Sequence, residues 1–414
     1  MREIIGKQPT VAVVGGGLGG LATTICLAKA GFDVHVFERA AQLGEIGAGI
    51  NISPQATKVL YAIGLREQVE AIGNRVTGHR QRSMSTGEFL AETPFTDPDG
   101  EDRYGAPYYA FHRADLIEML AGAIAPERIH LGRTCTDLTE TPEGVTVGFA
   151  DGSRFEADAV IGADGIHSQV RRHLYGEDEA EYTGQMVWRA LVDASDLPED
   201  VLGPHGFYGW IGKGSHLMTY FLRGTKVINI TTQADVDTWT EEGWSIPGDP
   251  EQMRASFPGA TGDLARLLDR VTDCSKWGLF GRRPSRDWGR GRIQLIGDAA
   301  HPMLPNAGQG AAQAFEDAYV LARWMDEHAG DLPAAFEGFR EVRIPRAHAV
   351  QRQSLANSKL VHAGDWEQRR DTFRAREQSG DTPLGLGWIY DYDVKEQWDQ
   401  ITRYPLSESD APVA

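Results

Sequence analysis

The sequence predicts an α/β fold: a parallel sheet flanked by helices, interrupted by a β-rich segment and followed by further helices. Two observations carry this prediction. Residues 10–38 read as a strand, a glycine-rich turn, a helix and a second strand, which is the start of a parallel sheet. Residues 181–280, in contrast, are rich in aromatic residues, Thr and Gly and contain alternating segments, as expected for a β-rich region.

Size, charge and cysteine content limit the possible classes of function. At 414 residues, the chain is long enough for two closely packed domains or for one large domain with an insertion. Its net charge of -18 argues against sequence-independent binding to nucleic acid or acidic lipid, which both require a basic surface. The three cysteines lie far apart, without the paired spacing of a metal site. Because no signal peptide or membrane span is evident either, we expect a cytoplasmic protein without metal, nucleic-acid or membrane partners.

The first expected element is a dinucleotide-binding turn. Residues 10–14 (TVAVV) form a continuous apolar run, as a parallel strand buried on both faces should. Three glycines then follow at G-x-G-x-x-G spacing: Gly15, Gly17 and Gly20. The first makes a tight turn, the second lets N–H groups approach a pyrophosphate, and the third lets the helix over 18–30 pack closely. Glu38 ends the second strand, where it suits the hydroxyls of an adenosine ribose. This pattern alone does not distinguish NAD from FAD.

Two later strand ends also carry an Asp. Asp164 and Gly165 follow the buried strand in DAVIGADGIHSQVR, and Asp298 follows the strand in IQLIGDAAHP. The carboxyl end of a strand is where open α/β sheets bind ligands. Gly308 and Gly310 then introduce a helix, whose positive N-terminal end would face the bound molecule.

In this order, the three motifs resemble those of the single-component FAD-dependent aromatic hydroxylases, the para-hydroxybenzoate hydroxylase type. The resemblance covers about residues 10–350. The stretches GAGINISPQATKVLYAIGL, YGAPYYAFHRADL and GDAAHPMLPNAGQGAAQAFEDA are most similar to the branch that acts on hydroxylated aromatic acids. That branch includes 6-hydroxynicotinate 3-monooxygenase, 3-hydroxybenzoate 6-hydroxylase and salicylate hydroxylase. The resemblance implies a glutathione-reductase-type FAD-binding Rossmann domain with an interleaved β-rich substrate domain and C-terminal helices.

The resemblance also suggests where the domains divide. The expected FAD-binding domain comprises residues 1–73, 101–180 and 281–350, and the expected substrate domain comprises residues 74–100 and 181–280. Residues 351–414 would form a C-terminal helical segment and tail, after helical spacing that is interrupted at Pro345. These helices would cover the FAD-binding domain or form a dimer contact, so monomer and homodimer both remain open.

The implied cofactor is non-covalently bound FAD, with NADH or NADPH as a transient co-substrate. In the family, the residue matching Glu38 binds the adenosine ribose, and the residue matching Asp298 binds the sugar and ribityl region. The residue matching Arg113 contacts the phosphate and ribityl region, and the Asp164 segment is associated with both FAD and NAD(P)H. We expect Arg39 to belong to this group as well. The helix N-terminus after Gly308 and Gly310 would stabilise the negative charge of a reduced flavin.

The substrate is expected against the middle segment. In SHLMTYFLRG, strand alternation puts His216, Met218 and Tyr220 on one face, which could line a pocket for an aromatic ring. The resemblance implies that His216 acts as base toward the substrate hydroxyl and that Tyr220 orients it. The alternative is that His216 is an ordinary histidine of the sheet.

Three residues outside this strand complete the expected pocket: Asn51, Pro305 and Asn306. The 6-hydroxynicotinate enzymes carry histidines at the positions of Asn51 and Asn306. Because Asn does not change protonation near neutral pH, we expect this pocket to recognise a different ring pattern.

The implied reaction is hydroxylation of a phenolic or hydroxylated heteroaromatic carboxylic acid by O₂ and NAD(P)H. In the family, O₂ adds at flavin C4a to give a hydroperoxide, and the substrate ring, made electron-rich by ionisation of its hydroxyl, attacks the distal oxygen. Two alternatives stay open: an epoxidase or hydroxylase of a larger polycyclic metabolite, and a flavin-binding protein without turnover.

Overall fold

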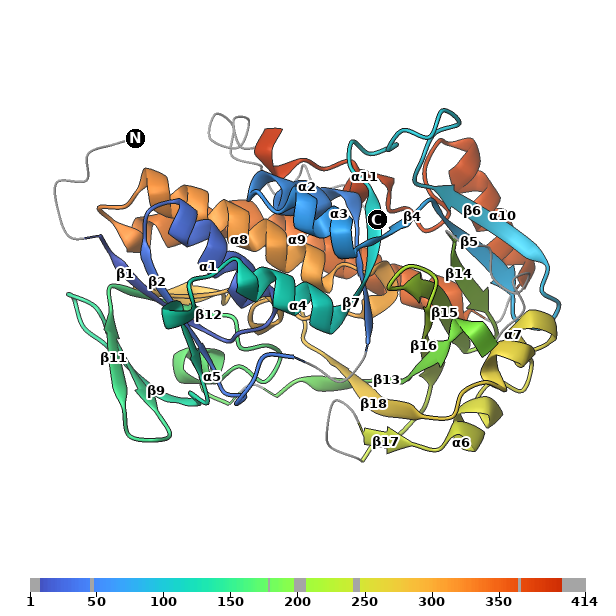
Figure 1. Ribbon diagram of the computed structural model, residues 1–414, viewed down its shortest axis with the longest axis horizontal. Helices are drawn as coiled ribbons and strands as arrows, with labels where there is room; N and C mark the ends of the chain where they lie inside the picture. Colours follow the sequence, from blue (N-terminus) through green and yellow to red (C-terminus); the bar gives the residue numbers. More distant parts are fainter. Residues whose placement is uncertain are drawn as a thin grey trace.

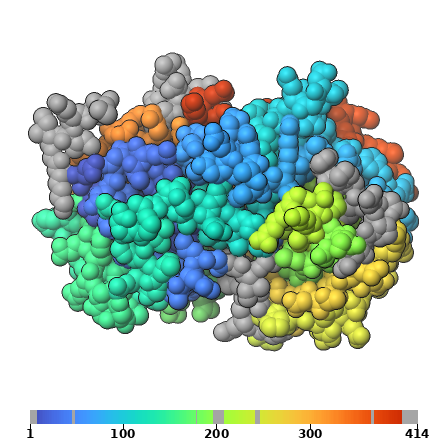
Figure 2. All heavy atoms as spheres, viewed as in Figure 1, coloured from blue at the N-terminus to red at the C-terminus, as the bar shows by residue number. Residues whose placement is uncertain are grey.

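Two large sheets lie at opposite ends of the molecule in the computed structural model, with long helices between them (Figure 1). The structure describes residues 8–44, 48–177, 179–196, 206–240, 246–363 and 366–396. The predicted C-terminal tail, at the end of the segment 351–414, lies outside these ranges. In the space-filling view, lime and yellow segments of the second sheet gather at one end, away from the dark blue segments of the first sheet (Figure 2).

The first sheet has six strands in the order β19-β20-β12-β1-β2-β8. Their bounds are β1 Thr10–Val14, β2 Asp33–Glu38, β8 Ile129–Leu131, β12 Ala159–Gly162, β19 Gly289–Arg290 and β20 Ile293–Leu295. All pair in parallel except β19, which is antiparallel to β20. All five residues of β1 are buried, as the apolar run over 10–14 predicts for a central parallel strand. The predicted α/β fold class is confirmed.

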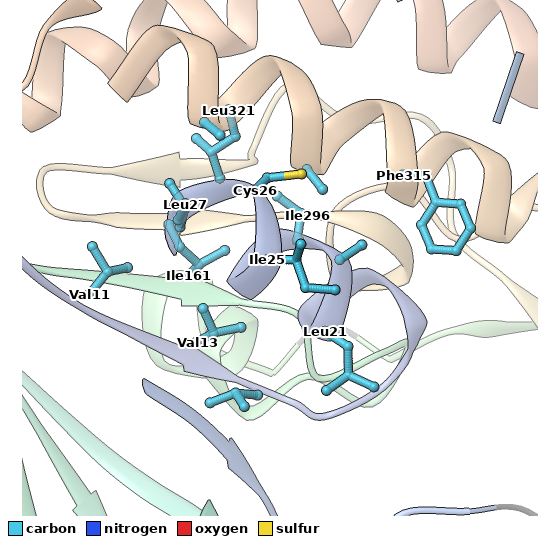
Figure 3. Close-up of a cluster of buried hydrophobic side chains, with 14 of the residues drawn as sticks. Val11, Val13, Leu21, Ile25, Cys26, Leu27, Ile161, Ile296, Phe315 and Leu321 are labelled. Carbon is cyan, nitrogen blue, oxygen red and sulfur yellow. The ribbon is translucent and has the colours of Figure 1, made fainter. Parts of the chain in front are cut away.

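Helix α1 (Leu18–Lys29) packs between this sheet and α8 (Gly310–Glu327). Figure 3 shows Leu21 and Ile25 of α1 between Val13 and Ile161 of the strands and Phe315 of α8. Each such apolar side chain stabilises the fold by roughly 1.5–3 kcal/mol when fully buried. This packing fixes the start of α1, where the glycine turn lies.

The second sheet has eight strands in the order β17-β18-β13-β16-β15-β14-β5-β6. Their bounds are β5 Gly78–Ser83, β6 Phe89–Pro94, β13 Glu181–Asp193, β14 Gly206–Ile211, β15 Ser215–Leu222, β16 Val227–Asp235, β17 Ile246–Gly248 and β18 Cys274–Gly281. Helices α6 (Pro250–Ala255) and α7 (Gly262–Leu268) pack their apolar residues on one face. The other face turns towards Tyr108 and the C-terminal segment, and there Phe207 and Tyr220 pack near Tyr108 and Tyr390.

Smaller elements complete the fold. One three-stranded sheet contains β9 (Cys135–Glu140), β10 (Val145–Phe149) and β11 (Arg154–Ala157), and another contains β3 (Gly49–Ile52), β4 (Asn74–Val76) and β7 (Tyr108–His112). The remaining α-helices are α2 Pro54–Ala62, α3 Arg66–Ile72, α4 Arg113–Gly122, α5 Gln169–Tyr175, α9 Leu332–His362, α10 Trp366–Gln378 and α11 Gly387–Tyr390. Among the described residues, no helix has both the length and the hydropathy needed to cross a bilayer.

Helix α9 differs from the sequence prediction. It runs unbroken from Leu332 to His362, although Pro345 lies inside it. A proline removes one N–H donor, and here the carbonyl that loses its partner belongs to Glu341, which is exposed, so water can satisfy it. The helix therefore crosses the expected boundary between residues 350 and 351. The division into domains stays a proposal.

Candidate active site

A cavity of about 800 Å³ lies between the second sheet and the end of the first. Asp298, Gly308 and Gly310 line it from the segment that follows β20, and His216 and Tyr220 line it from the second sheet. The C-terminal segment also contributes, with Val361, Leu384, Leu386 and Tyr390. The helical spacing of this segment predicts a position over the FAD-binding domain or at a dimer contact, whereas in the structure it also lines the cavity.

The glycine turn after β1 has the packing that its spacing predicts. Gly15 has a φ of 110°, and a methyl group there would lie 2.4 Å from the carbonyl oxygen of Ala163. At Gly20 a methyl group would lie 1.9 Å from the carbonyl oxygen of Gly15. At Gly17, however, it would meet no atom within 4 Å. Two of the glycines therefore permit close packing, and the backbone at the third is open to a bound group.

Glu38 and Arg39 lie beside this turn. The carboxylate of Glu38 accepts hydrogen bonds from the backbone N–H of Gly16 at 2.7 Å and of Ala40 at 2.8 Å. It thus holds the turn in place while its half-buried side chain remains accessible. Arg39 is exposed, and its charge contributes to the lowered pKa of His167 on the loop after β12, an effect caused first by burial.

Asp164 has a structural task in addition to the expected one. Its carboxylate accepts hydrogen bonds from the Ser168 hydroxyl and from the backbone N–H groups of Gln169 and Val170. These bonds close the loop after β12 and cap the start of α5. Burial raises the pKa of Asp164, although the hydrogen bonds oppose this shift. Its contact with a nucleotide remains a prediction.

Asp298 follows β20 and presents its side chain to the cavity, as the motif predicts. The side chain is accessible from the cavity but surrounded by protein, and this loss of solvent raises its pKa, against the opposing charges of His301 and Arg113. Arg113, the first residue of α4, therefore lies close enough to act on this carboxylate. Helix α8 begins at Gly310 without a side-chain cap at its N-terminus, which also opens onto the cavity.

His216, Met218 and Tyr220 all line the cavity, as the alternation of β15 predicts. Nδ1 of His216 lies 2.8 Å from Nε2 of His362, the last residue of α9. Burial lowers the pKa of His216 well below its ordinary value of 6.5, and His362, His79 and Arg369 add to the effect. His216 is therefore a neutral imidazole at neutral pH.

Tyr220 is held at the far end of this row. Gly49 makes room for it, since a methyl group there would lie 2.6 Å from Cε2 of Tyr220. Burial raises the pKa of the Tyr220 hydroxyl, and the opposing influences are the charge of Arg189 and the amides of Asn51 and Asn229. The hydroxyl therefore stays protonated.

The other expected pocket residues also reach the cavity. Asn51 lies on β3, and Pro305 and Asn306 follow β20 in a short 3₁₀ turn over Pro305–Ala307. Nδ2 of Asn306 donates to Oε1 of Gln233 at 2.6 Å. In the described part of the chain, Oδ1 of Asn51 and Oδ1 of Asn306 are buried and accept no hydrogen bond. Because a buried acceptor is costly to leave unpaired, both atoms point to a bound polar group.

Other cavity residues that were not anticipated from the sequence include Arg189, His79 and Gln81. Arg189 on β13 lies with its guanidinium 4.3 Å from the ring centre of Trp277. His79 and Gln81 face the cavity from β5, and burial lowers the pKa of His79 to about 4. The alternation in GHRQRS could have placed the latter two on one face. The sequence around Arg189 contains no local pattern that would predict its side chain to face a pocket.

These residues fit an FAD molecule. The backbone at Gly17 is open and the carboxylate of Asp298 is accessible from the cavity. Helices α1 and α8, which begin beside these residues, have no side-chain cap at their N-termini. Uncapped helix N-termini bind phosphates and other anionic groups, and an accessible carboxylate binds sugar hydroxyls. The sequence motifs and the geometry therefore agree on the same cofactor.

Comparison with known proteins gives the same result. The model of the FAD binding domain family matches residues 8–353. The chain is 36% identical to 3-amino-4-hydroxybenzoate 2-monooxygenase of Streptomyces platensis, over 95% of this chain and 98% of that protein. It is 35% identical to 6-hydroxynicotinate 3-monooxygenase of Bordetella bronchiseptica, over 85% of this chain and 92% of that protein.

A solved structure agrees with these sequence matches. Salicylate hydroxylase in complex with its substrate superposes with a TM-score of 0.81 at 28% identity, covering 97% of this chain and 99% of that one. The predicted resemblance to flavin-dependent aromatic hydroxylases is thereby confirmed. The chain belongs to the FAD binding domain family, in which its relatives are monooxygenases of aromatic compounds.

Proposed function

We propose that this protein is an FAD-dependent monooxygenase that uses NADH or NADPH and O₂ to hydroxylate an aromatic carboxylic acid carrying a ring hydroxyl. The observation that supports this most strongly is the shared cavity. Asp298 and the start of α8, which fit the flavin, face the same space as His216 and Tyr220. When bound, FAD supplies the electron transfer from the nicotinamide and the activation of O₂.

His216 is the proposed base. Its Nδ1 is engaged by His362, which leaves Nε2 to accept the proton of the substrate hydroxyl. Because the imidazole is neutral, this nitrogen can take up a proton. Loss of that proton makes the ring electron-rich, which is the state that electrophilic hydroxylation requires.

Tyr220 and Arg189 would orient the ring. The protonated Tyr220 hydroxyl can donate a hydrogen bond to the substrate oxygen once that oxygen is ionised. Arg189 lies close enough to lower the pKa of Tyr220, so it can likewise favour an anionic substrate, and its guanidinium matches a carboxylate. We propose that Arg189 binds the carboxylate of the aromatic acid.

The relatives suggest which acids to test first. Both 3-amino-4-hydroxybenzoate and 6-hydroxynicotinate carry the hydroxyl para to the carboxylate, and they are named as substrates of the two relatives. The amide oxygens of Asn51 and Asn306 favour the first, because its ring amino group can donate to acceptors that lack a donor among the described residues.

The test is consumption of NADH and of NADPH by the FAD-loaded protein with a panel of acids, with product identification. The panel contains 3-amino-4-hydroxybenzoate, 6-hydroxynicotinate, 3-hydroxybenzoate and 4-aminobenzoate, the last of which lacks the hydroxyl. We expect substrate-stimulated oxidation and a hydroxylated product from at least one hydroxylated acid and none from 4-aminobenzoate. A protein that retains FAD but converts none of these acids would contradict the proposal.

Cellular location and assembly are part of the same proposal. The three cysteines are buried free thiols, and burial raises the pKa of Cys26 to about 12, so this thiol is unreactive. That supports a reducing cytoplasm as the place of action. We propose a monomer or a homodimer, to be distinguished by light scattering.

A further inference from the structure

Three side chains form a hydrogen-bonded chain that starts at the cavity. Nδ1 of His216 on β15 lies 2.8 Å from Nε2 of His362 at the end of α9. Nδ1 of His362 lies 2.6 Å from Oδ1 of Asp235, the last residue of β16. Neither His362 nor Asp235 belongs to a cofactor motif, and His362 lies beyond residue 353, where the match to the family model ends.

The exposure of the three side chains increases along the chain. His216 lines the cavity, the side chain of His362 is only 6% exposed, and that of Asp235 is 50% exposed. The chain therefore begins at the place proposed for the substrate hydroxyl and ends in solvent. A row of groups that each accept and donate a proton between those two points is what proton transfer requires.

The carboxylate sets the tautomer of both rings. Asp235 can only accept when ionised, so the bond to it requires the proton of His362 on Nδ1. Nε2 of His362 is then an acceptor, and the bond to it requires the proton of His216 on Nδ1. Nε2 of His216 is left unprotonated, which is the form that a base needs.

Neighbouring groups hold His362 in this position. The amide of Gln185 donates to Oδ1 of Asp235 at 3.0 Å and lies 3.1 Å from Nδ1 of His362, and it also bonds Ser358 on α9. On the other side Arg369 of α10 donates to the carbonyl oxygens of Leu360 and Ala363. The last turn of α9 is thus fixed from β13 and from α10.

We propose that His216, His362 and Asp235 form a proton relay that carries the proton of the substrate hydroxyl from the cavity to solvent. The substrate O–H bond breaks as a bond forms to Nε2 of His216, whose Nδ1 proton passes to Nε2 of His362. The Nδ1 proton of His362 passes to Asp235 and then to water. The reverse sequence returns a proton to the product phenolate and restores both tautomers. This inference rests on the proposed function, because it needs a substrate hydroxyl.

The charges around His216 explain why this residue has to pass a proton on to the relay. His79 on β5, Arg369 on α10 and His362 on α9 all disfavour a positive His216, in addition to its burial. A proton taken from the substrate is therefore held poorly on this ring and is better passed on. Asp235 offers the compensating negative charge, which also acts on Tyr182 of β13.

The experiment measures proton release by the FAD-loaded enzyme on mixing with whichever hydroxylated acid of the panel it converts fastest. Phenol red in weakly buffered solution reports the released proton in a stopped-flow instrument. We expect His362→Gln and Asp235→Asn each to slow proton release and hydroxylation by roughly 10-fold to 100-fold, below the full effect of losing a base, with normal FAD content. Asp237→Asn, the same charge change two residues further along the chain, is the matched control and should behave as the parent.

A readout specific to proton transfer separates the relay from a structural role. In His362→Ala, added imidazole should restore the rate in proportion to its concentration, whereas a damaged fold would not respond. If the His362 variants fail to fold, the half-exposed Asp235→Asn variant carries the test. Parent-like proton release in His362→Gln and Asp235→Asn, with slow release in His216→Ala, would overturn the relay and leave the proposed function standing. A parent enzyme that retains FAD but hydroxylates no acid of the panel would overturn both.

Discussion

Arg343 on α9 and Asp317 on α8 form a completely buried ion pair, with 2.8 Å between Nε and Oδ1. The other carboxylate oxygen of Asp317 accepts from the backbone N–H of Gly297 at 2.9 Å and lies 2.6 Å from Nε2 of His301. Arg343 also pairs with Glu316 at 2.6 Å. This network therefore connects two long helices to the turn that carries Asp298.

We expect Arg343→Met to destabilise the protein by about 3–5 kcal/mol, because it leaves two carboxylates buried with fewer partners. Urea unfolding with a linear extrapolation measures this. Arg323→Met is the control, since Arg323 pairs with Glu327 on the exposed side of α8 and should cost less than about 1 kcal/mol. If both variants lost the same free energy of unfolding, the buried ion pairs would stabilise the protein no more than the exposed pair does.

The same network predicts that the folded protein loses stability at acidic pH. Burial alone would raise the pKa of Asp317, but the charges of His301 and Arg343 outweigh it and lower the pKa from 3.8 to about 2. A folded-state pKa below the unfolded one contributes stability above the unfolded value, and this contribution is lost as the pH falls through the folded value. We expect the free energy of unfolding to drop between about pH 4 and pH 2 and to drop less steeply in Asp317→Asn. If the free energy of unfolding fell equally steeply with pH in the parent and in Asp317→Asn, Asp317 would not be the group responsible.

Asp298→Ala should weaken FAD binding by roughly 1.5–3 kcal/mol, the usual contribution of a hydrogen bond to a charged group. Fluorescence titration of the apoprotein with FAD measures the change. Glu38→Ala should also loosen FAD but leave the order of preferred aromatic acids unchanged, because its proposed contact is with the adenosine end. An unchanged FAD affinity in Asp298→Ala would remove this residue from the cofactor site.

Arg189→Met should raise the dissociation constant of the preferred aromatic acid by about 10-fold to 100-fold if a charged hydrogen bond to the carboxylate is lost. The matching carboxamide of the same acid, which has no negative charge, should bind parent and variant about equally. The two dissociation constants can be measured from the perturbed flavin absorbance. Equal weakening for the acid and the amide would mean that Arg189 supports the pocket without binding the carboxylate.

The sequence allowed the local elements of the site to be predicted because their signals are short-range. The run over 10–14, the glycine spacing after it and the alternation of His216 and Tyr220 follow from backbone geometry with periods of two or three to four residues. The contacts of His216 with His362, 146 residues away, could not be found in this way. Such pairs depend on how α9 packs on the second sheet, which no local pattern encodes.

The ion pairs around Asp317 were missed for a related reason. Their partners are 26 and 27 residues apart on two helices, and charged residues in a helical pattern normally indicate a solvent-exposed face. Pro345 was similarly read as an interruption, although packing of α9 along its length keeps the helix continuous. In both cases tertiary contacts override a local preference.

The most direct test of the central claim, that His216 draws the proton from a hydroxylated aromatic acid beside the flavin, is product formed per NAD(P)H consumed, together with the hydroxylation rate, in parent and His216→Ala. We predict hydroxylated product in near-stoichiometric yield from the parent. In the variant we predict a hydroxylation rate lower by about 10²–10⁴-fold with normal FAD content, the usual effect of losing a general base. A His216→Ala variant that hydroxylates as fast and couples as well as the parent would contradict the account.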